Sequence, residues 1–266
     1  MRRRRTRAIA LLVFLALVAL GAYGVSYASY LPQLSIERIE VSGTSEVQPE
    51  AVTTFVESHL ESHSFSFISP RNIFLYPRRT IETALREYFP HIESAKISRE
   101  SLLATAVVVS VKERKPFARW CETTDSCYAI DSGGFIFAPA STTLSGFETA
   151  YLFEGALPEA SSPVGQTYLP ARFSGMIALL ERLGQAGFSS RRISLDGEQD
   201  FTVGLADRFQ LRVTFGSDVS AIVKNLELIL DSETLRGKEG ELEYIDLRFG
   251  NRVYYKLRGA DQQTAE

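Results

Sequence analysis

The chain has 266 residues, with 29 Lys and Arg against 32 Asp and Glu, and a formal net charge of −3. Hydrophobic residues make up 45% and charged residues 23%, which excludes a disordered chain. Five arginines lie before residue 8, so 24 basic side chains face 32 acidic ones in the remainder, a balance that excludes a general nucleic-acid binder.

An uncharged, mostly apolar stretch covers residues 8–30 and follows the arginine-rich residues 1–7. A bilayer core needs about 20 apolar helical residues, so we predict a transmembrane helix over 8–30. The arginines predict that residues 1–7 form a cytoplasmic stub and that the chain from Ser35 onward is exported. A cleaved signal peptide is the alternative, with Ser-Tyr-Ala at 26–28 as its cleavage site.

The first exported segment, residues 34–116, is predicted to fold as one domain with the order β-α-α-β-β. Strands are indicated by alternation of apolar and polar residues, and a proline at a first helical position begins each helix. The predicted elements are strands over 36–41, 92–97 and 105–113 and helices over 49–60 and 77–88.

Residues 117–258 are predicted to form a second domain, a mixed α+β fold built on an extended antiparallel sheet. Its elements are a hairpin over 128–137, a long surface loop over 138–165 with a short strand at 151–153, helices over 173–183 and 219–229, and strands over 192–195, 201–205, 209–215, 242–249 and 252–257. The polar residues 259–266 have no periodic pattern and are predicted to be a disordered tail.

The two cysteines, Cys121 and Cys127, are separated by five residues in the exported part of the chain. An exported segment permits a disulfide, which would staple the connection that enters the hairpin. Free thiols are the alternative, and a redox pair is disfavoured because no C-x-x-C motif is present.

Motifs for catalysis or metal binding are absent from the sequence. It has no G-x-S-x-G, S-x-x-K or G-x-x-x-x-G-K motif. His59 and His63 have the i, i+4 spacing of a zinc helix, but Leu60 stands where H-E-x-x-H requires Glu. The acidic tract 239–243 is expected to be a solvated strand face, with a glycosidase-type carboxylate pair as the alternative. We therefore expect no metal and no cofactor.

The last predicted strands, over residues 244–257, alternate charged and aromatic side chains. A final strand often lies at a sheet edge, where free backbone N–H and C=O groups can accept a partner strand. The alternative is an ordinary edge strand that is protected by its basic side chains, Arg252, Lys256 and Arg258.

Four stretches of the sequence, in this order along the chain, resemble the FtsQ/DivIB family of bacterial cell-division proteins. They are Ile-Glu-Arg-Ile-Glu-Val-Ser-Gly at 36–43, Phe-Pro-His-Ile-Glu-Ser-Ala-Lys-Ile at 89–97, the segment from Val109 to Trp120, and Tyr-Ile-Asp-Leu-Arg-Phe-Gly-Asn-Arg-Val at 244–253. The segment 34–116 is similar to the polypeptide-transport-associated (POTRA) domain of that family.

The resemblance implies a single-pass inner-membrane protein with a cytoplasmic N-terminus, located at the division septum. It implies a non-enzymatic scaffold that recruits coiled-coil division proteins of the FtsB/DivIC and FtsL types and helps to position septal peptidoglycan synthesis. The family's contact region corresponds here to Phe249, Asn251, Val253 and Tyr254. The alternatives are an exported POTRA-type sensor or chaperone, and an envelope enzyme.

Overall fold

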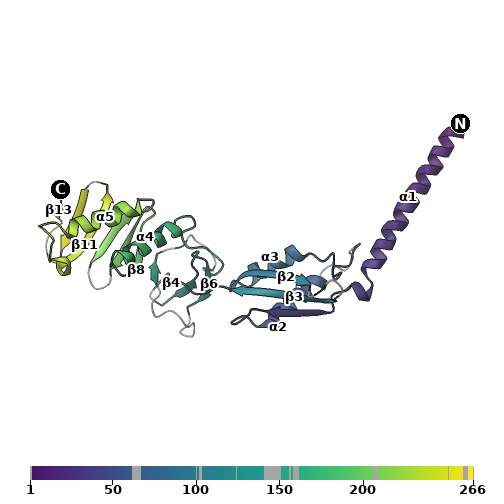
Figure 1. Ribbon diagram of the computed structural model, residues 1–266, viewed down its shortest axis with the longest axis horizontal. Coiled ribbons are helices and arrows are strands. Elements are labelled where there is room, and N and C mark those ends of the chain that lie inside the picture. Colours follow the sequence, from purple (N-terminus) through teal and green to yellow (C-terminus); the bar gives the residue numbers. More distant parts are fainter. Residues whose placement is uncertain are drawn as a thin grey trace. The chain divides into compact units, whose positions relative to one another are not determined.

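The computed structural model describes residues 2–61, 67–99, 101, 104–123, 125–140, 151–155, 157, 162–205, 209–250, 252–259 and 263–265 (Figure 1). The chain divides into two compact units, residues 1–114 and 115–266. The helices are α1 (Arg2–Ser29), α2 (Pro49–Glu61), α3 (Arg78–Tyr88), α4 (Phe173–Gln185) and α5 (Val219–Leu230), with short 3-10 helices η1 (Pro32–Leu34) and η2 (Glu239–Glu241). The strands are β1 (Arg38–Ser42), β2 (Ile92–Arg99), β3 (Ala106–Glu113), β4 (Ala118–Cys121), β5 (Cys127–Ile130), β6 (Ile136–Pro139), β7 (Tyr151–Glu154), β8 (Ser190–Asp196), β9 (Asp200–Leu205), β10 (Gln210–Thr214), β11 (Leu242–Phe249), β12 (Arg252–Leu257) and β13 (Gln263–Ala265).

The N-terminal helix α1 is apolar along most of its length. Its segment Arg5–Ser29 contains an 18-residue stretch with a mean hydropathy of 2.5, and the segment is long and apolar enough to cross a membrane, by length and composition. A signal sequence passes the same test, so the helix is an anchor or a signal. No part of this 18-residue stretch is buried against the rest of the described chain. Its side chains therefore need an apolar environment that the described residues do not supply.

The first unit has the predicted order β-α-α-β-β. Its sheet has the order β1-β3-β2, in which β3 runs parallel to β1 and antiparallel to β2. Alternation along β3 turns three valines toward the helices, which pack on that face of the sheet through their own apolar stripes. The buried residues of this core include Val52, Val56, Leu60, Ile81, Leu85, Val107, Val109 and Val111.

The loop between β1 and α2 is tied to the end of β3. Gly43 has a φ of 85°, and a Cβ at this position would overlap the carbonyl oxygen of Val111. The Glu113 carboxylate accepts hydrogen bonds from the backbone N–H groups of Ser45 (2.8 Å), Val47 (2.9 Å) and Glu46 (3.0 Å). One side chain on β3 thus satisfies three donors of a loop that has no strand or helix partner of its own.

The second unit is a mixed α+β fold, but its sheet is not the antiparallel sheet that we predicted. The strand order is β13-β12-β11-β10-β9-β8-β7-β4-β5-β6, and the pairs β4–β7, β7–β8 and β10–β11 are parallel. Helix α4 connects β7 to β8, and α5 connects β10 to β11. A helical crossover returns the chain to the same end of the sheet, so the strands that it joins run in parallel.

Helices α4 and α5 contact each other and pack against β8 and β11 respectively. Strands β9, β10 and β11 turn alternate side chains toward this helical layer, and these side chains form the larger core. Members of that core include Phe201, Val203, Leu205, Leu211, Val213, Ile245, Leu247, Met176, Leu180, Leu183 and Leu226. The opposite face of these strands presents polar and aromatic side chains.

The predicted disordered tail contains a strand. Within residues 259–266, Gln263–Ala265 form β13, which pairs antiparallel with β12 in the register Val253↔Ala265. The sequence did not predict this strand, because backbone pairing on a free strand edge needs no apolar side-chain pattern. As a consequence, β13 and not β12 is the outermost strand at this end of the sheet.

Candidate functional site

The predicted contact residues lie on the hairpin formed by β11 and β12. Its turn contains Gly250, whose φ of 65° belongs to the left-handed region that glycine adopts without strain. Phe249 is the last residue of β11 and is 54% exposed. Val253 and Tyr254 are half-buried on β12, and Asn251 lies outside the described residues.

The hairpin brings Phe249 and Tyr254 together. Their ring centroids are 5.2 Å apart with an interplanar angle of 82°, which is the edge-to-face arrangement that aromatic pairs prefer. Val253 packs against the core, as do its neighbours Tyr255 and Leu257. Because successive side chains of a strand point to opposite faces, the structure separates Val253 from the aromatic pair.

The side chain of Arg248 lies beside the aromatic pair and is held by two carboxylates of the sheet. Its guanidinium donates from Nε (2.9 Å) and Nη2 (2.6 Å) to the two carboxylate oxygens of Asp246, and from Nη1 to Asp200 at 3.0 Å. Its Cζ lies 5.5 Å from the centroid of the Phe249 ring. Hydrogen bonds with Asp246 outweigh the effect of burial and raise the pKa of Arg248 above its ordinary value.

Sequence reasoning missed this cluster, although Asp246 and Arg248 stand two residues apart on one strand, so that both side chains point to the same face. Asp246 is 2% exposed, and a carboxylate so deeply buried requires a cationic partner. Asp200 comes from β9, and no signal in the sequence connects it with Arg248. The two carboxylates therefore hold Arg248 in one position beside Phe249.

The same face of the sheet carries further paired charges and aromatic rings. The guanidinium of Arg212 on β10 lies 3.8 Å from the centroid of the Tyr244 ring, and Lys256 pairs with Glu243 at 3.0 Å. Tyrosine, phenylalanine and arginine side chains are enriched in protein–protein interfaces, where they bury large areas and also form hydrogen bonds. The chemistry of this face suits recognition of another protein.

The cysteines lie elsewhere in the same sheet. Cys121 and Cys127 stand opposite each other on β4 and β5 and are joined by a disulfide, and the structure has no free cysteine. The neighbouring Trp120 is buried and donates from its indole N–H to the carbonyl oxygen of Gly155 at 3.0 Å. Five strands lie between β4 and β12, so the disulfide braces the hairpin away from the aromatic pair.

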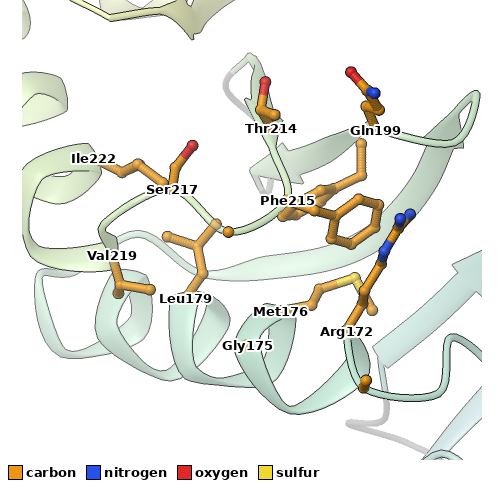
Figure 2. Close-up of a pocket in the computed structure, with 13 residues that line it drawn as sticks. Arg172, Gly175, Met176, Leu179, Gln199, Thr214, Phe215, Ser217, Val219 and Ile222 are labelled. Atoms are coloured by element: carbon orange, nitrogen blue, oxygen red, sulfur yellow. The ribbon is translucent and has the colours of Figure 1, made fainter.

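A pocket of about 510 Å³ lies between α4 and the turn that leads from β10 into α5 (Figure 2). Figure 2 shows the Arg172 guanidinium beside the Phe215 ring. The Cζ atom of Arg172 lies 5.3 Å from the centroid of that ring. The other lining side chains are mostly apolar and include Met176, Leu179, Phe201, Val219 and Ile222, with Gln199, Thr214 and Ser217 as polar members. Such a lining can hold an apolar group and orient it through a few hydrogen bonds.

Only part of the candidate metal site lies within the described residues. His59 on α2 lies with its Nδ1 2.9 Å from the carbonyl oxygen of Phe55, and His63 lies outside the described residues. Glu239 and Glu241 belong to η2 and not to the predicted strand, whereas Glu243 lies on β11. Among the described residues, no group of three or more His, Cys, Asp or Glu side chains could hold a metal ion.

No protein-family model matches the chain, and no curated protein matches its sequence. The functional assignment therefore depends on the terminal hairpin and on the elements that precede it.

Proposed function

We propose that this protein is a bitopic membrane scaffold of cell division, similar to the FtsQ/DivIB family, and that its second unit recruits coiled-coil membrane proteins of the FtsB/DivIC and FtsL types. In this proposal α1 is an uncleaved anchor with its N-terminus in the cytoplasm. Both units lie outside the cytoplasm at the septum, where the scaffold positions the septal peptidoglycan synthase. The protein binds and positions partners and catalyses no reaction.

Two properties of the chain support an extracytoplasmic location. Its N-terminal helix is apolar, as anchors and signals are, and its two cysteines form a disulfide. Disulfides persist in oxidising compartments and are rare in the cytosol. The arginines that precede the apolar segment favour an orientation with the N-terminus inside.

The aromatic pair of exposed Phe249 and half-buried Tyr254 is the observation that carries the proposed recruitment. Phe249 is one of few large hydrophobic side chains after α1 that are exposed in the described chain, and Arg248 holds a guanidinium beside it. An exposed aromatic ring in a fixed position loses little conformational entropy when a partner covers it. Anchoring in one membrane raises the effective concentration of the partners, so a small interface with modest affinity can suffice.

The end of the sheet beside this pair offers a route for strand addition. Three residue pairs join β13 to β12, so the partner strand has only a short ladder to replace. We expect the partner strand to take the place of β13 on β12 and to cover Tyr254 and Phe249. Backbone hydrogen bonds would then set the register, and the aromatic rings would provide specificity.

The test is the affinity of the full-length protein, in detergent, for its coiled-coil partners from dividing cells. Aromatic hot spots contribute about 2 kcal/mol or more, so the Phe249→Ala/Tyr254→Ala variant should bind about thirtyfold more weakly. Leu228→Ala is the matched control, because Leu228 is 61% exposed and lies on α5 in the same unit. Its affinity should stay at the wild-type value.

Two outcomes would contradict the proposal. A folded double-alanine variant that binds with wild-type affinity would place the interface elsewhere. Capture of soluble exported polypeptides, with no membrane protein among them, would favour a sensor or chaperone. Circular dichroism should first show that both variants are folded.

A further inference from the structure

The loop before α3, residues 67–76, is attached directly to the outer end of α1; we call it the junction loop. Its Ser69 N–H donates to Ser29 Oγ at 3.0 Å, and its Asn72 Nδ2 donates to the carbonyl oxygen of Ser29, also at 3.0 Å. In addition, the Ser26 hydroxyl donates to the carbonyl oxygen of Phe67 at 2.7 Å. Ser29, Ser69 and Asn72 are buried, so these bonds form a packed joint.

The junction loop presents an unusual share of exposed apolar side chains. Among the described residues after Leu31, six large hydrophobic side chains are exposed, and three of them are Phe67 (59%), Phe74 (53%) and Leu75 (53%). These three side chains gather on one short loop, whereas single exposed hydrophobics scattered over a surface need no explanation. A cluster of exposed apolar side chains is typical of a surface that contacts another protein or a membrane.

The hydrogen bonds to α1 place this loop at the depth of the membrane surface. Ser26 lies three residues before the end of the helix, which is about 4–5 Å along its axis. The apolar segment Arg5–Ser29 is about 37 Å long at 1.5 Å per residue, which exceeds the bilayer core of about 30 Å. If α1 is the anchor of the proposed function, its outer end lies among the lipid headgroups, with the Phe67 backbone beside it.

Aromatic and cationic side chains around the loop fit the same environment. Tyr27 and Tyr30, at the end of α1, are 66% and 51% exposed, and tyrosine is enriched at membrane–water interfaces. Arg79 is exposed a few residues after the loop, and the Arg99 guanidinium lies 4.6 Å from the centroid of the Phe74 ring. Cations next to exposed aromatic residues are typical of surfaces that bind anionic phospholipids.

We propose that the junction loop is a second membrane contact, in which Phe67, Phe74 and Leu75 insert into the headgroup layer that surrounds the outer end of α1. The occupant of this surface is the phospholipid bilayer itself. The inference rests on the anchored form of α1 in the proposed function. It adds that the first unit is held against the membrane by two attachments, the helix and the loop.

The test uses the full-length protein in vesicles of phosphatidylethanolamine and phosphatidylglycerol. Single cysteines replace Phe67, Phe74 or Leu75 and carry an environment-sensitive fluorophore. Both native cysteines are in the disulfide, so each introduced thiol is labelled alone. Parallel vesicles contain a phospholipid with a nitroxide quencher near its glycerol backbone. Leu228→Cys is the solvent control, and Leu17→Cys, within α1, reports insertion of the helix; both positions are more than 60% exposed in the protein alone.

Labels at positions 67, 74 and 75 are expected to lose most of their emission in the quencher vesicles, while the label at 228 keeps its emission. If the label at 17 is shielded from water but the three loop labels behave like the label at 228, the loop does not touch the membrane and the inference is wrong, although the anchor stands. If the label at 17 also remains in water, α1 is not inserted, and both the anchor and the loop contact are wrong.

Discussion

Replacement of Glu113 by glutamine should release the loop between β1 and α2. The Glu113 carboxylate accepts from the N–H groups of Ser45, Glu46 and Val47 at 2.8–3.0 Å. Burial raises the pKa of Glu113, but these three hydrogen bonds outweigh burial and lower the pKa below its ordinary value. The ionised side chain is therefore the form that holds the loop.

The size of the effect follows from this geometry. Hydrogen bonds to a charged group contribute about 1.5–3 kcal/mol each, but they are not additive when they share one acceptor. Glutamine keeps one acceptor oxygen, loses the charge and turns an NH2 group toward backbone donors. We expect the free energy of loop opening to fall by about 2 kcal/mol, which corresponds to roughly thirtyfold faster amide exchange at residues 45–47.

Hydrogen exchange of the full-length protein in detergent measures this opening directly. Glu93→Gln is the matched control, because the exposed Glu93 carboxylate pairs with Lys112 at 2.7 Å on the same sheet. An exposed ion pair contributes about 0–1 kcal/mol, so this control should leave exchange at residues 45–47 unchanged. Equal exchange rates at these residues in wild type and Glu113→Gln would show that the Glu113 carboxylate does not hold the loop.

The pH dependence provides a second check. Since the pKa of Glu113 is lower in the folded state, its stabilisation is complete well above the ordinary glutamate value of about 4.3. The stabilisation is lost as the pH falls through the folded-state pKa. The difference in unfolding free energy between wild type and Glu113→Gln should therefore shrink from about pH 5 downward. A difference that stays constant into acid would exclude the ionised carboxylate as its cause.

Three further predictions concern the second unit. Asp246→Ala removes two of the three carboxylate contacts of Arg248, so chemical denaturation should show a loss of about 3 kcal/mol, and a loss below about 1 kcal/mol would contradict the described cluster. Replacement of Cys121 and Cys127 by serine removes the disulfide that closes a short loop, so thermal unfolding should show a free energy of unfolding that is lower by about 2–3 kcal/mol, with partner affinity unchanged. Mass spectrometry without reduction should find the two cysteines linked in the exported wild type. Truncation after Gly259 removes β13 and should strengthen partner binding in a titration, whereas weaker binding would show that β13 belongs to the interface.

Periodicity in the sequence was sufficient to predict the elements of the first unit. The helical spacing of Val52, Val56 and Leu60 and the alternation of Val107, Val109 and Val111 correspond to buried faces in the structure. These patterns are local, because the spacing of apolar residues within one segment indicates both its secondary structure and its buried face. Long-range pairing leaves no such local signal.

The arrangement of the second sheet depended on such long-range pairing. Residues 151–153 and 192–195 were predicted to be strands, but their residues carry no signal that the two strands pair in parallel. Similarly, Asp200 lies 48 residues from Arg248, and only the fold places the two side chains at 3.0 Å. Of the predicted contact residues, the alternation of β12 could have separated Val253 from Tyr254, whereas the contact between Phe249 and Tyr254 required the geometry of the turn.

The most direct test of recruitment through the terminal hairpin is photo-crosslinking from Tyr254 in living, dividing cells. A photoreactive amino acid replaces Tyr254 in the full-length protein, and Leu228, which is exposed on α5, is the control position. If the terminal hairpin recruits the partner, Tyr254 should crosslink to a small coiled-coil membrane protein and Leu228 should not. Equal crosslinking from both positions, or crosslinks from Tyr254 to soluble exported proteins alone, would contradict recruitment through the terminal hairpin.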